Sequence, residues 1–206
     1  MQRKLTVIFS ADVVGYSGLM ERDEGGTLAR LKENRRSLFD PQVQAHGGRI
    51  FKLMGDGVLI EFPSASSAVS CAIEIQRAME TAEPDVPQGE RLRYRIGINL
   101  GDVIIEGDDI YGDGVNVAAR LQALAPVGGI AMSRSVSDQV AGKVAAEVDD
   151  LGLHSVKNIA RPVHVFTVRG TGAPAKRAGA ATSAGEKRVS ICVLPFANMS
   201  GDVEQE

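Results

Sequence analysis

The sequence is poor in cysteine and in aromatic residues, and it lacks long apolar runs. Its 206 residues include two cysteines, Cys71 and Cys192, and no tryptophan. Two distant cysteines without a cluster of further ligands argue against a disulfide framework and against a zinc site. No stretch reaches the roughly 20 apolar residues of a membrane helix, and the N-terminus has no signal-peptide pattern. We therefore expect a cytoplasmic protein with no membrane segment in this chain.

The charge balance argues against a nucleic-acid partner. The formal net charge is −3, and aromatic residues make up 4% of the chain. Binding to nucleic acid through counterion release needs a basic field, and RNA-binding ferredoxin-like modules usually stack bases on sheet aromatics. We expect no nucleic-acid partner, so a small anionic ligand would need a local site.

Composition changes along the chain predict one complete domain followed by a linker. Residues 1–169 have ordinary globular patterning, whereas residues 170–188 are small, flexible and basic and cannot bury enough apolar surface to fold alone. A new apolar run begins at about residue 189. We interpret residues 189–206 as the start of a truncated C-terminal domain.

Apolar periodicity and turn residues predict the order of the secondary structure. The run KLTVIFS predicts a strand that ends close to Asp12, and an Asp-Gly pair between two β-branched runs predicts a hairpin with Asp56 at its tip. The predicted elements are a strand at 4–10, a helix at 24–46 with an irregularity at Pro41, strands at 49–54 and 58–62, a helix at 64–81, strands at 91–99 and 103–106 joined by a turn at Gly101-Asp102, a helix at 115–124, and strands at 128–132 and 162–168.

This order begins with the βαββαβ pattern of a ferredoxin-like sheet, so we predict an α+β fold with additional strands. In such a sheet, Asp12 after the first strand and Asp56 at the hairpin tip can bring their carboxylates together. Paired carboxylates with substrate phosphates are a typical site for Mg²⁺. Taken singly, the two aspartates have ordinary explanations, because Asp12 suits a cap or turn and Asp56 suits a plain Asp-Gly hairpin.

Three segments in order resemble the signature segments of class III adenylate and guanylate cyclases: FSADVVGYS, FKLMGDG and DIYGDGVNVAARL. The segment GINLGDV precedes the third. The resemblance covers about Leu5 to Val168, and it implies the class III cyclase fold and an adenylate cyclase activity in signal transduction. The implied reaction converts ATP to 3′,5′-cyclic AMP and pyrophosphate by two-metal-ion catalysis.

The resemblance also implies roles for individual residues. Two Mg²⁺ or Mn²⁺ ions would be bound at Asp12, Val13 and Asp56. The substrate would be bound by Lys52 and Asp109, which read the adenine base, and by the loop residues Val14, Gly15 and Tyr16. The catalytic groups would be Asn116, Arg120 and a further phosphate-binding cation, for which we favour Lys157 over Arg161.

A lysine and a carboxylate fit adenine, because adenine has an acceptor at N1 and a donor at N6, whereas guanine reverses both groups. In the family, the metal aspartates come from one subunit, while the base-reading pair, the asparagine and the arginine come from the other. The resemblance therefore implies a homodimer with two equivalent sites. The alternative is a catalytically silent nucleotide sensor with the same fold, and formation of cyclic AMP distinguishes the two.

Overall fold

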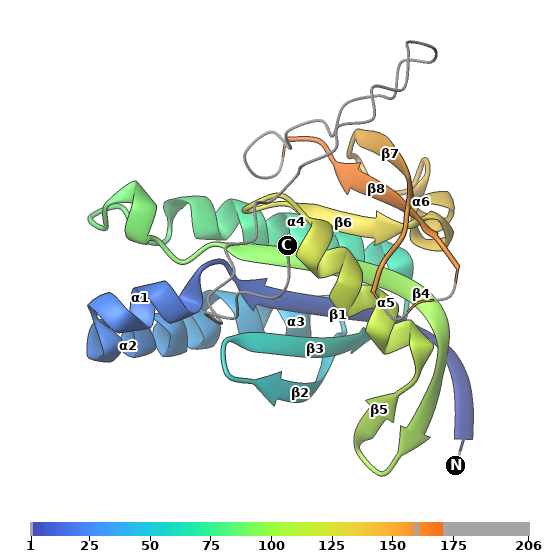
Figure 1. Cartoon of the computed structure of the whole chain (residues 1–206), viewed down its shortest axis with the longest axis horizontal. Coiled ribbons are helices and arrows are strands. Elements are labelled where there is room, and N and C mark those ends of the chain that lie inside the picture. Colours follow the sequence, from blue (N-terminus) through green and yellow to red (C-terminus); the bar gives the residue numbers. More distant parts are fainter. Residues whose placement is uncertain (1, 158, 160, 171–206) are drawn as a thin grey trace, which may run out of the picture. The chain divides into compact units, whose positions relative to one another are not determined.

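The computed structural model describes residues 2–157, 159 and 161–170, which form an α+β fold around one sheet (Figure 1). The strand order of this eight-stranded sheet is β2-β3-β1-β4-β6-β8-β7, and β5 pairs with β4 beside this path. The strands are β1 (Gln2–Val13), β2 (Arg49–Met54), β3 (Gly57–Phe62), β4 (Tyr94–Glu106), β5 (Asp109–Tyr111), β6 (Ile130–Ser133), β7 (Val148–His154) and β8 (Val163–Val168). The helices are α1 (Tyr16–Arg22), α2 (Glu24–Asn34), the π-helix η1 (Arg35–Phe39), α3 (Asp40–Ala45), α4 (Ala65–Thr81), the short 3₁₀ helix η2 (Gln88–Glu90), α5 (Asp113–Leu124) and α6 (Arg134–Val140).

The first four strands have the ferredoxin-like arrangement that the sequence predicts. Strand β1 is central and pairs antiparallel with both β3 and β4, and β2 pairs antiparallel with β3 at the edge. Beyond β4, the parallel partner β6 and then β8 and β7 extend the sheet. The predicted fold class is therefore confirmed.

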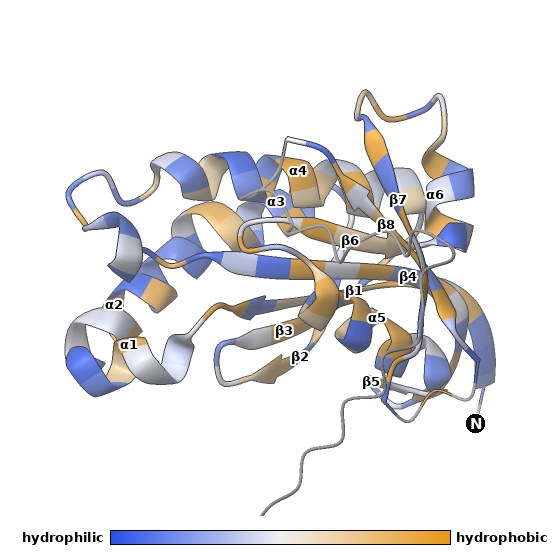
Figure 2. Ribbon diagram, turned by 45° about the horizontal axis from the view of Figure 1, so that its top comes forward, coloured by the Kyte–Doolittle hydropathy of each residue, from blue (hydrophilic) through white to orange (hydrophobic). Residues whose placement is uncertain are grey.

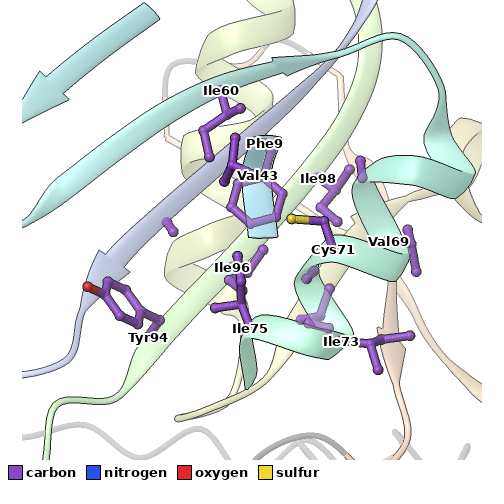
Figure 3. Close-up of a cluster of buried hydrophobic side chains, with 14 of the residues drawn as sticks. Phe9, Val43, Ile60, Val69, Cys71, Ile73, Ile75, Tyr94, Ile96 and Ile98 are labelled. Atoms are coloured by element: carbon purple, nitrogen blue, oxygen red, sulfur yellow. The ribbon is translucent and has the colours of Figure 1, made fainter. Parts of the chain in front are cut away.

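The main hydrophobic core lies between the sheet and the layer of helices that includes α3 and α4. Alternate residues of β1 point into it, and Phe9 packs there against Phe39 and Phe62 with ring centroids 6.4 and 5.6 Å apart. Cys71 of α4 is buried among these side chains (Figure 3), and burial raises the pKa of its thiol to about 12. Cys71 is therefore an inert core thiol, whereas Cys192 lies outside the described residues.

Helix α5 lies on the opposite side of the sheet from α3 and α4 (Figure 2). It packs on β4, β1 and β6, and we call this side of the sheet the α5 face. Gly97 of β4 permits the close packing, because a Cβ atom there would lie 2.1 Å from the backbone N of Gln122 and 2.2 Å from the carbonyl O of Ala118. The backbones of α5 and β4 are thus in direct contact.

The prediction of a hairpin turn at Gly101-Asp102 is wrong. Strand β4 runs through this point without a turn, because β1 pairs with it along its whole length, including Thr6 opposite Gly101. The chain reverses later, at Gly107, which has a left-handed φ of 62°, and the returning strand is β5. The sequence contains a Gly-Asp pair at both places, and the long ladder with β1 decides between them.

The range 24–46, which was predicted as one helix, is helical over most of its length, but a π-helix interrupts the α-helix before Pro41. The segment η1 is a π-helix, in which the backbone N–H of Asp40 donates to the carbonyl of Arg35. Proline has no backbone N–H, so the regular hydrogen-bond ladder cannot continue unchanged through Pro41. Helix α6 and strand β7 follow β6 and were not predicted individually.

The described helices include none with the length and apolar character needed to span a membrane. Of the predicted linker at 170–188, all but residue 170 lies outside the described residues, and so does the predicted start of a second domain at 189–206. The division of the chain into a domain, a linker and a second domain therefore stays a prediction.

Candidate active site

The two aspartates singled out in the sequence converge at one corner of the sheet. Asp12 lies near the end of β1, and Asp56 lies in the turn between β2 and β3, as the hairpin signal predicts. The pairing of Ala11 with Val58 brings the turn alongside Asp12, and the two carboxyl groups are in hydrogen-bonding contact. Asp12 points to the α5 face, because its neighbours Ala11 and Val13 point into the main core.

Bringing two carboxyl groups together changes the acidity of Asp12. Burial, followed by the hydrogen bond and the negative charge of Asp56, raises the pKa of Asp12 to about 6. The backbone N–H of Val13 and the guanidinium of Arg95 act in the opposite direction. A cation between the two carboxylates would remove their mutual repulsion, so this donor pair fits a divalent metal ion.

The number of protein ligands is small but sufficient for magnesium. No group of three His, Cys, Asp or Glu side chains that could hold a metal occurs in the described part of the chain. Mg²⁺ commonly uses one or two carboxylates and takes its remaining ligands from water and substrate phosphates. The side chain of Val13 is buried in the main core, so Val13 can offer only backbone atoms to a cation.

Arg95 is a residue of this corner that the sequence did not reveal. It pairs with Asp12 in the β1–β4 ladder and therefore shares the α5 face with it. Its buried Nε has no hydrogen-bond partner among the described residues. The alternation in RLRYRIGIN predicts that Arg95 points to the opposite face of the strand from Tyr94 and Ile96. Only the pairing register of the strands shows that it lies beside Asp12.

The loop after β1 carries the predicted phosphate-binding residues. Gly15 has a left-handed φ of 66° and precedes α1, whose first turn has no side-chain cap. The backbone N–H of Val14 donates to the carbonyl of Arg93 at 2.8 Å and is already engaged. The N–H groups of the first turn, beginning at Tyr16, lack helical partners and are the ones available to an anion.

A β-bulge directs Lys52 toward the α5 face. Ile50 pairs with Ile60 and Lys52 pairs with Leu59, so Phe51 is an extra residue in β2. Without this bulge, Lys52 would lie on the same face as Ile50, which packs against the main core. The bulge therefore places Lys52 on the same side of the sheet as Asp12.

Lys52 and Asp109, the two residues predicted to read the base, are in direct contact. The Nζ of Lys52 lies 3.1 Å from Oδ2 of Asp109, and the hydroxyl of Tyr111 donates to the same oxygen at 2.7 Å. Lys52 also lies 5.1 Å from the ring centre of Tyr111. The hydrogen bonds from Tyr111 and then Lys52 lower the pKa of Asp109, so its carboxylate is an acceptor at neutral pH.

Asn116 and Arg120 lie one turn apart on α5. Asn116 is exposed and Arg120 is half-buried. The start of the helix is fixed to the sheet, because the side chain of the buried Asn99 donates to the carbonyl of Gly114 at 3.1 Å. The helix thus presents both residues from a fixed position on the α5 face.

Lys157 and Arg161 both lie exposed in the connection between β7 and β8. Because both residues are exposed, exposure does not distinguish them as the phosphate-binding cation, and the choice between them stays open. The three histidines have ordinary partners: His46 contacts Glu74, His154 contacts the carbonyl of Leu151, and His164 contacts Asp150.

Asp12 and Asp56, which we call the metal corner after their predicted role, are separated within one chain from Lys52 and Asp109, the predicted base-reading pair. Lys52 pairs with Leu59, and Leu59 pairs with Ser10 of β1, so two strand spacings, roughly 10 Å, lie between Lys52 and β1. Along the β2–β3 hairpin, Lys52 and Asp56 are also four residues apart. One chain thus carries two separate groups of functional side chains on one face.

The comparisons with known proteins agree with these observations. The family model for the adenylate and guanylate cyclase catalytic domain matches residues 1–170. The protein named "Putative adenylate cyclase 3" from Rhizobium meliloti is 46% identical over 212 residues, which cover 100% of this chain and 35% of that protein. An adenylate cyclase from Streptomyces coelicolor is 32% identical over 140 residues, covering 68% of this chain and 35% of that protein. The chain therefore spans about a third of the length of these relatives.

Solved structures show the same fold. An adenylate/guanylate cyclase/hydrolase from Silicibacter pomeroyi has a TM-score of 0.75 and 48% identity, with 82% of this chain and 98% of that chain covered. The adenylyl cyclase CyaB from P. aeruginosa has a TM-score of 0.70 and 28% identity, with 81% and 94% covered. Sequence, fold and comparisons agree that this chain belongs to the adenylate and guanylate cyclase catalytic domain family.

Proposed function

We propose that this domain is an adenylate cyclase that converts ATP to 3′,5′-cyclic AMP and pyrophosphate in the cytoplasm, with two Mg²⁺ or Mn²⁺ ions, at the interface of a homodimer. The observation that carries the proposal is the presence, on one face of the sheet, of the converging Asp12 and Asp56 and of the Lys52–Asp109 pair. The names of relatives and of well-matched solved structures support cyclase chemistry.

The metal ions would be held by Asp12 and Asp56, with backbone atoms of Val13 beside them. When bound, the ions lower the pKa of the ribose 3′-hydroxyl and neutralise charge on the phosphates. The 3′-hydroxyl would lose its proton to water and its oxygen would attack the α-phosphorus, the bond from the α-phosphorus to the oxygen that bridges to the β-phosphate would break, and pyrophosphate would leave. No protein nucleophile takes part.

Adenine recognition follows from the donor and acceptor groups of the base-reading pair. Lys52 would donate to N1 of adenine, and the ionised Asp109 would accept from the N6 amino group. Guanine has an acceptor at O6 and a donor at N1, so both contacts would be mismatched and buried polar groups would stay unpaired. This chemistry favours ATP over GTP.

The remaining polar groups have roles around the ribose and the phosphates. Asn116 would orient the ribose, and Arg120 would stabilise the charge that develops on the phosphates. Arg95 has an unpartnered, buried Nε beside Asp12 and would contact a phosphate oxygen of the substrate. The N–H groups at the start of α1, beginning at Tyr16, would donate hydrogen bonds to the triphosphate, with Lys157 as a further cation.

The separation of the two groups of side chains supports a dimer. A twofold axis would bring the metal corner of one protomer opposite the base-reading pair and α5 of its partner, and it would do so twice. Exposed apolar residues on the β2–β3 hairpin, Leu53 and Met54, are 56% and 50% exposed and would be covered by the partner.

A turnover assay tests this proposal. Purified protein is incubated with ATP or GTP and Mg²⁺ or Mn²⁺, and the products are separated by chromatography. We expect cyclic AMP from ATP, with kcat/KM for GTP lower by about a hundredfold or more. Nucleotide binding without any cyclic product would instead favour the silent sensor, and a preference for GTP would contradict the role of Lys52 and Asp109.

A further inference from the structure

Strand β2 contacts the β4–β5 hairpin at three successive points around Asp109. The Nη1 of Arg49 donates to the carbonyl of Asp108 at 3.2 Å. The side chain of Ile110, which is 2% exposed, is buried in the small core against which Phe51 packs. Lys52 forms its ion pair with Asp109 itself. The two residues that flank Asp109 are therefore both anchored to β2.

Arg49 is itself held by a buried carboxylate. Its Nε and Nη2 donate to Oε2 of Glu61 at 3.3 and 3.0 Å. The other oxygen of Glu61 accepts from Nζ of Lys4 at 2.7 Å and from the hydroxyl of Thr6 at 3.0 Å. Burial acts to raise the pKa of Glu61, but the hydrogen bonds from Lys4, Arg49 and Thr6 lower it, so Glu61 is ionised at neutral pH. The Arg49 guanidinium thus has a fixed orientation.

The hairpin needs such an anchor because its other attachments are few. Strand β5 has three residues and pairs with β4 alone in the described sheet. The turn is exposed, and Gly107 gives its backbone additional freedom. The β4 arm of the hairpin is also held by β1, through Ile104 and Ile105, but β5 has no second partner strand in the described sheet. The position of the Asp109 carboxylate therefore depends on contacts outside the hairpin.

We propose that Arg49, oriented by Glu61, is a positioning residue for base selection that holds the β4–β5 turn so that Asp109 stays in register with Lys52. The inference rests on the proposed function, because it assumes that Lys52 and Asp109 read the purine. In this arrangement β2 provides both one base-reading residue and the anchor for the other. Mispositioning Asp109 weakens the contact to adenine N6 without disturbing the metal corner.

The test uses two readouts on the same variants. The substitutions are Arg49→Gln and Glu61→Gln, with Arg49→Lys as the conservative variant. Arg36→Gln is the matched control, because Arg36 also forms a two-pronged pair with a glutamate, Glu33, but on the exposed surface of the helical layer. Amide hydrogen exchange over residues 107–111 is measured without nucleotide, and kcat and KM are measured with ATP and with GTP.

We expect faster amide hydrogen exchange over residues 107–111 in Arg49→Gln and Glu61→Gln. The KM for ATP should rise about tenfold in both variants, because a charge-assisted contact is lost. The preference for ATP over GTP should fall by a similar factor, while kcat with saturating ATP changes less than about twofold. Arg49→Lys should lie between wild type and Arg49→Gln, since lysine cannot bridge Glu61 and the Asp108 carbonyl with a rigid fork. Arg36→Gln should match wild type in all readouts.

Two results would overturn the inference while leaving the proposed function intact. The first is wild-type exchange, KM and nucleotide preference in Arg49→Gln. The second is an equal loss of kcat/KM for ATP and GTP together with a lower melting temperature, which would mean a general structural role. If wild-type protein produced no cyclic nucleotide from ATP or GTP, the proposed function would fail and the selectivity role with it, and the exchange data would still report whether Arg49 anchors the turn.

Discussion

Lys52 and Asp109, which are 57 residues apart in the chain, form an ion pair with Nζ and Oδ2 3.1 Å apart. Two features of the backbone create it: the bulge at Phe51, which turns Lys52 to the α5 face, and the turn at Gly107, which returns β5 toward β2. The pair is partly exposed, with side-chain exposures of 37% and 32%, so it is accessible to a base. Both partners are charged groups whose removal or reversal can be tested.

Reversing the charge of Lys52 should abolish adenine recognition. In Lys52→Glu, a second carboxylate would face Asp109, and the donor to adenine N1 would be lost. We expect kcat/KM for ATP to fall by about a hundredfold or more. Lys32→Glu, on the exposed surface of α2, is the control. An unchanged preference for ATP in Lys52→Glu would count against the base-reading assignment.

Removing Asp56 should abolish catalysis without unfolding the protein. Asp56→Ala deletes one of two converging carboxylates, and the hairpin turn tolerates the change because the side chain is only half-buried. We expect cyclic AMP formation to fall by at least about a hundredfold, with an unchanged circular dichroism spectrum. Asp85→Ala, in the exposed loop before β4, is the matched control. Retained activity in Asp56→Ala would refute the metal role of this residue.

Because the pKa of Asp12 is raised, a neutral residue at this position should increase the stability of the metal-free protein at high pH, although it should remove activity. The folded-state pKa of about 6 exceeds the ordinary value of 3.8, so the folded protein binds this proton more tightly than the unfolded chain does. Stability without metal should therefore fall as the pH rises through this window, from about 4 to about 6. The neutral side chain of Asp12→Asn escapes this loss.

We accordingly expect metal-free Asp12→Asn to melt about 2 °C or more above wild type at pH 8 and to match it at pH 4. The same variant should be inactive. Melting curves across the pH range, with a chelator present, measure the effect. A difference that stays constant between pH 4 and pH 8 would show that the charge of Asp12 is not its cause.

Gly97→Ala should displace α5. The added methyl group would lie within 2.2 Å of backbone atoms of α5, and backbone atoms cannot rotate away as a flexible side chain can. We expect a loss of about 1–3 kcal/mol in the free energy of unfolding and a fall in kcat, because Asn116 and Arg120 move with the helix. Gly89→Ala, where no atom lies within 4 Å of the added carbon, is the control in urea unfolding. Equal stability of the two variants would contradict the close packing.

The sequence is sufficient to predict that Asp12 and Asp56 converge, because local signals define their positions. An apolar run before Asp12 and an Asp-Gly pair at the hairpin tip place both carboxylates, and the βαββαβ order then brings them together. The ladder between β1 and β4 could not be predicted in the same way. A Gly-Asp pair occurs at 101–102 and again at 107–108, and the choice depends on pairing with β1, in which Thr6, 95 residues earlier, lies opposite Gly101.

The sequence did not reveal the residues whose neighbours are set by the pairing register of the strands. Arg95 lies beside Asp12 because the two residues are paired on the neighbouring strands β4 and β1, and the β4–β5 turn reaches Arg49, which Glu61 holds. The bulge at Phe51 has no distinctive residue such as glycine to mark it. Alternation within one strand predicts which face a residue lies on, but it does not predict the neighbour on the next strand.

In the proposed dimer, one protomer supplies the carboxylates and its partner supplies the catalytic and base-reading groups of each site. Mixing two inactive variants, Asp56→Ala and Arg120→Ala, tests it directly, because a mixed dimer would contain one site with both residues intact. With random pairing, half of the dimers are mixed and each has one working site, so we expect about a quarter of wild-type cyclic AMP formation. A mixture that stays as inactive as the separate variants, although size-exclusion chromatography and mass spectrometry detect mixed dimers, would contradict the shared site.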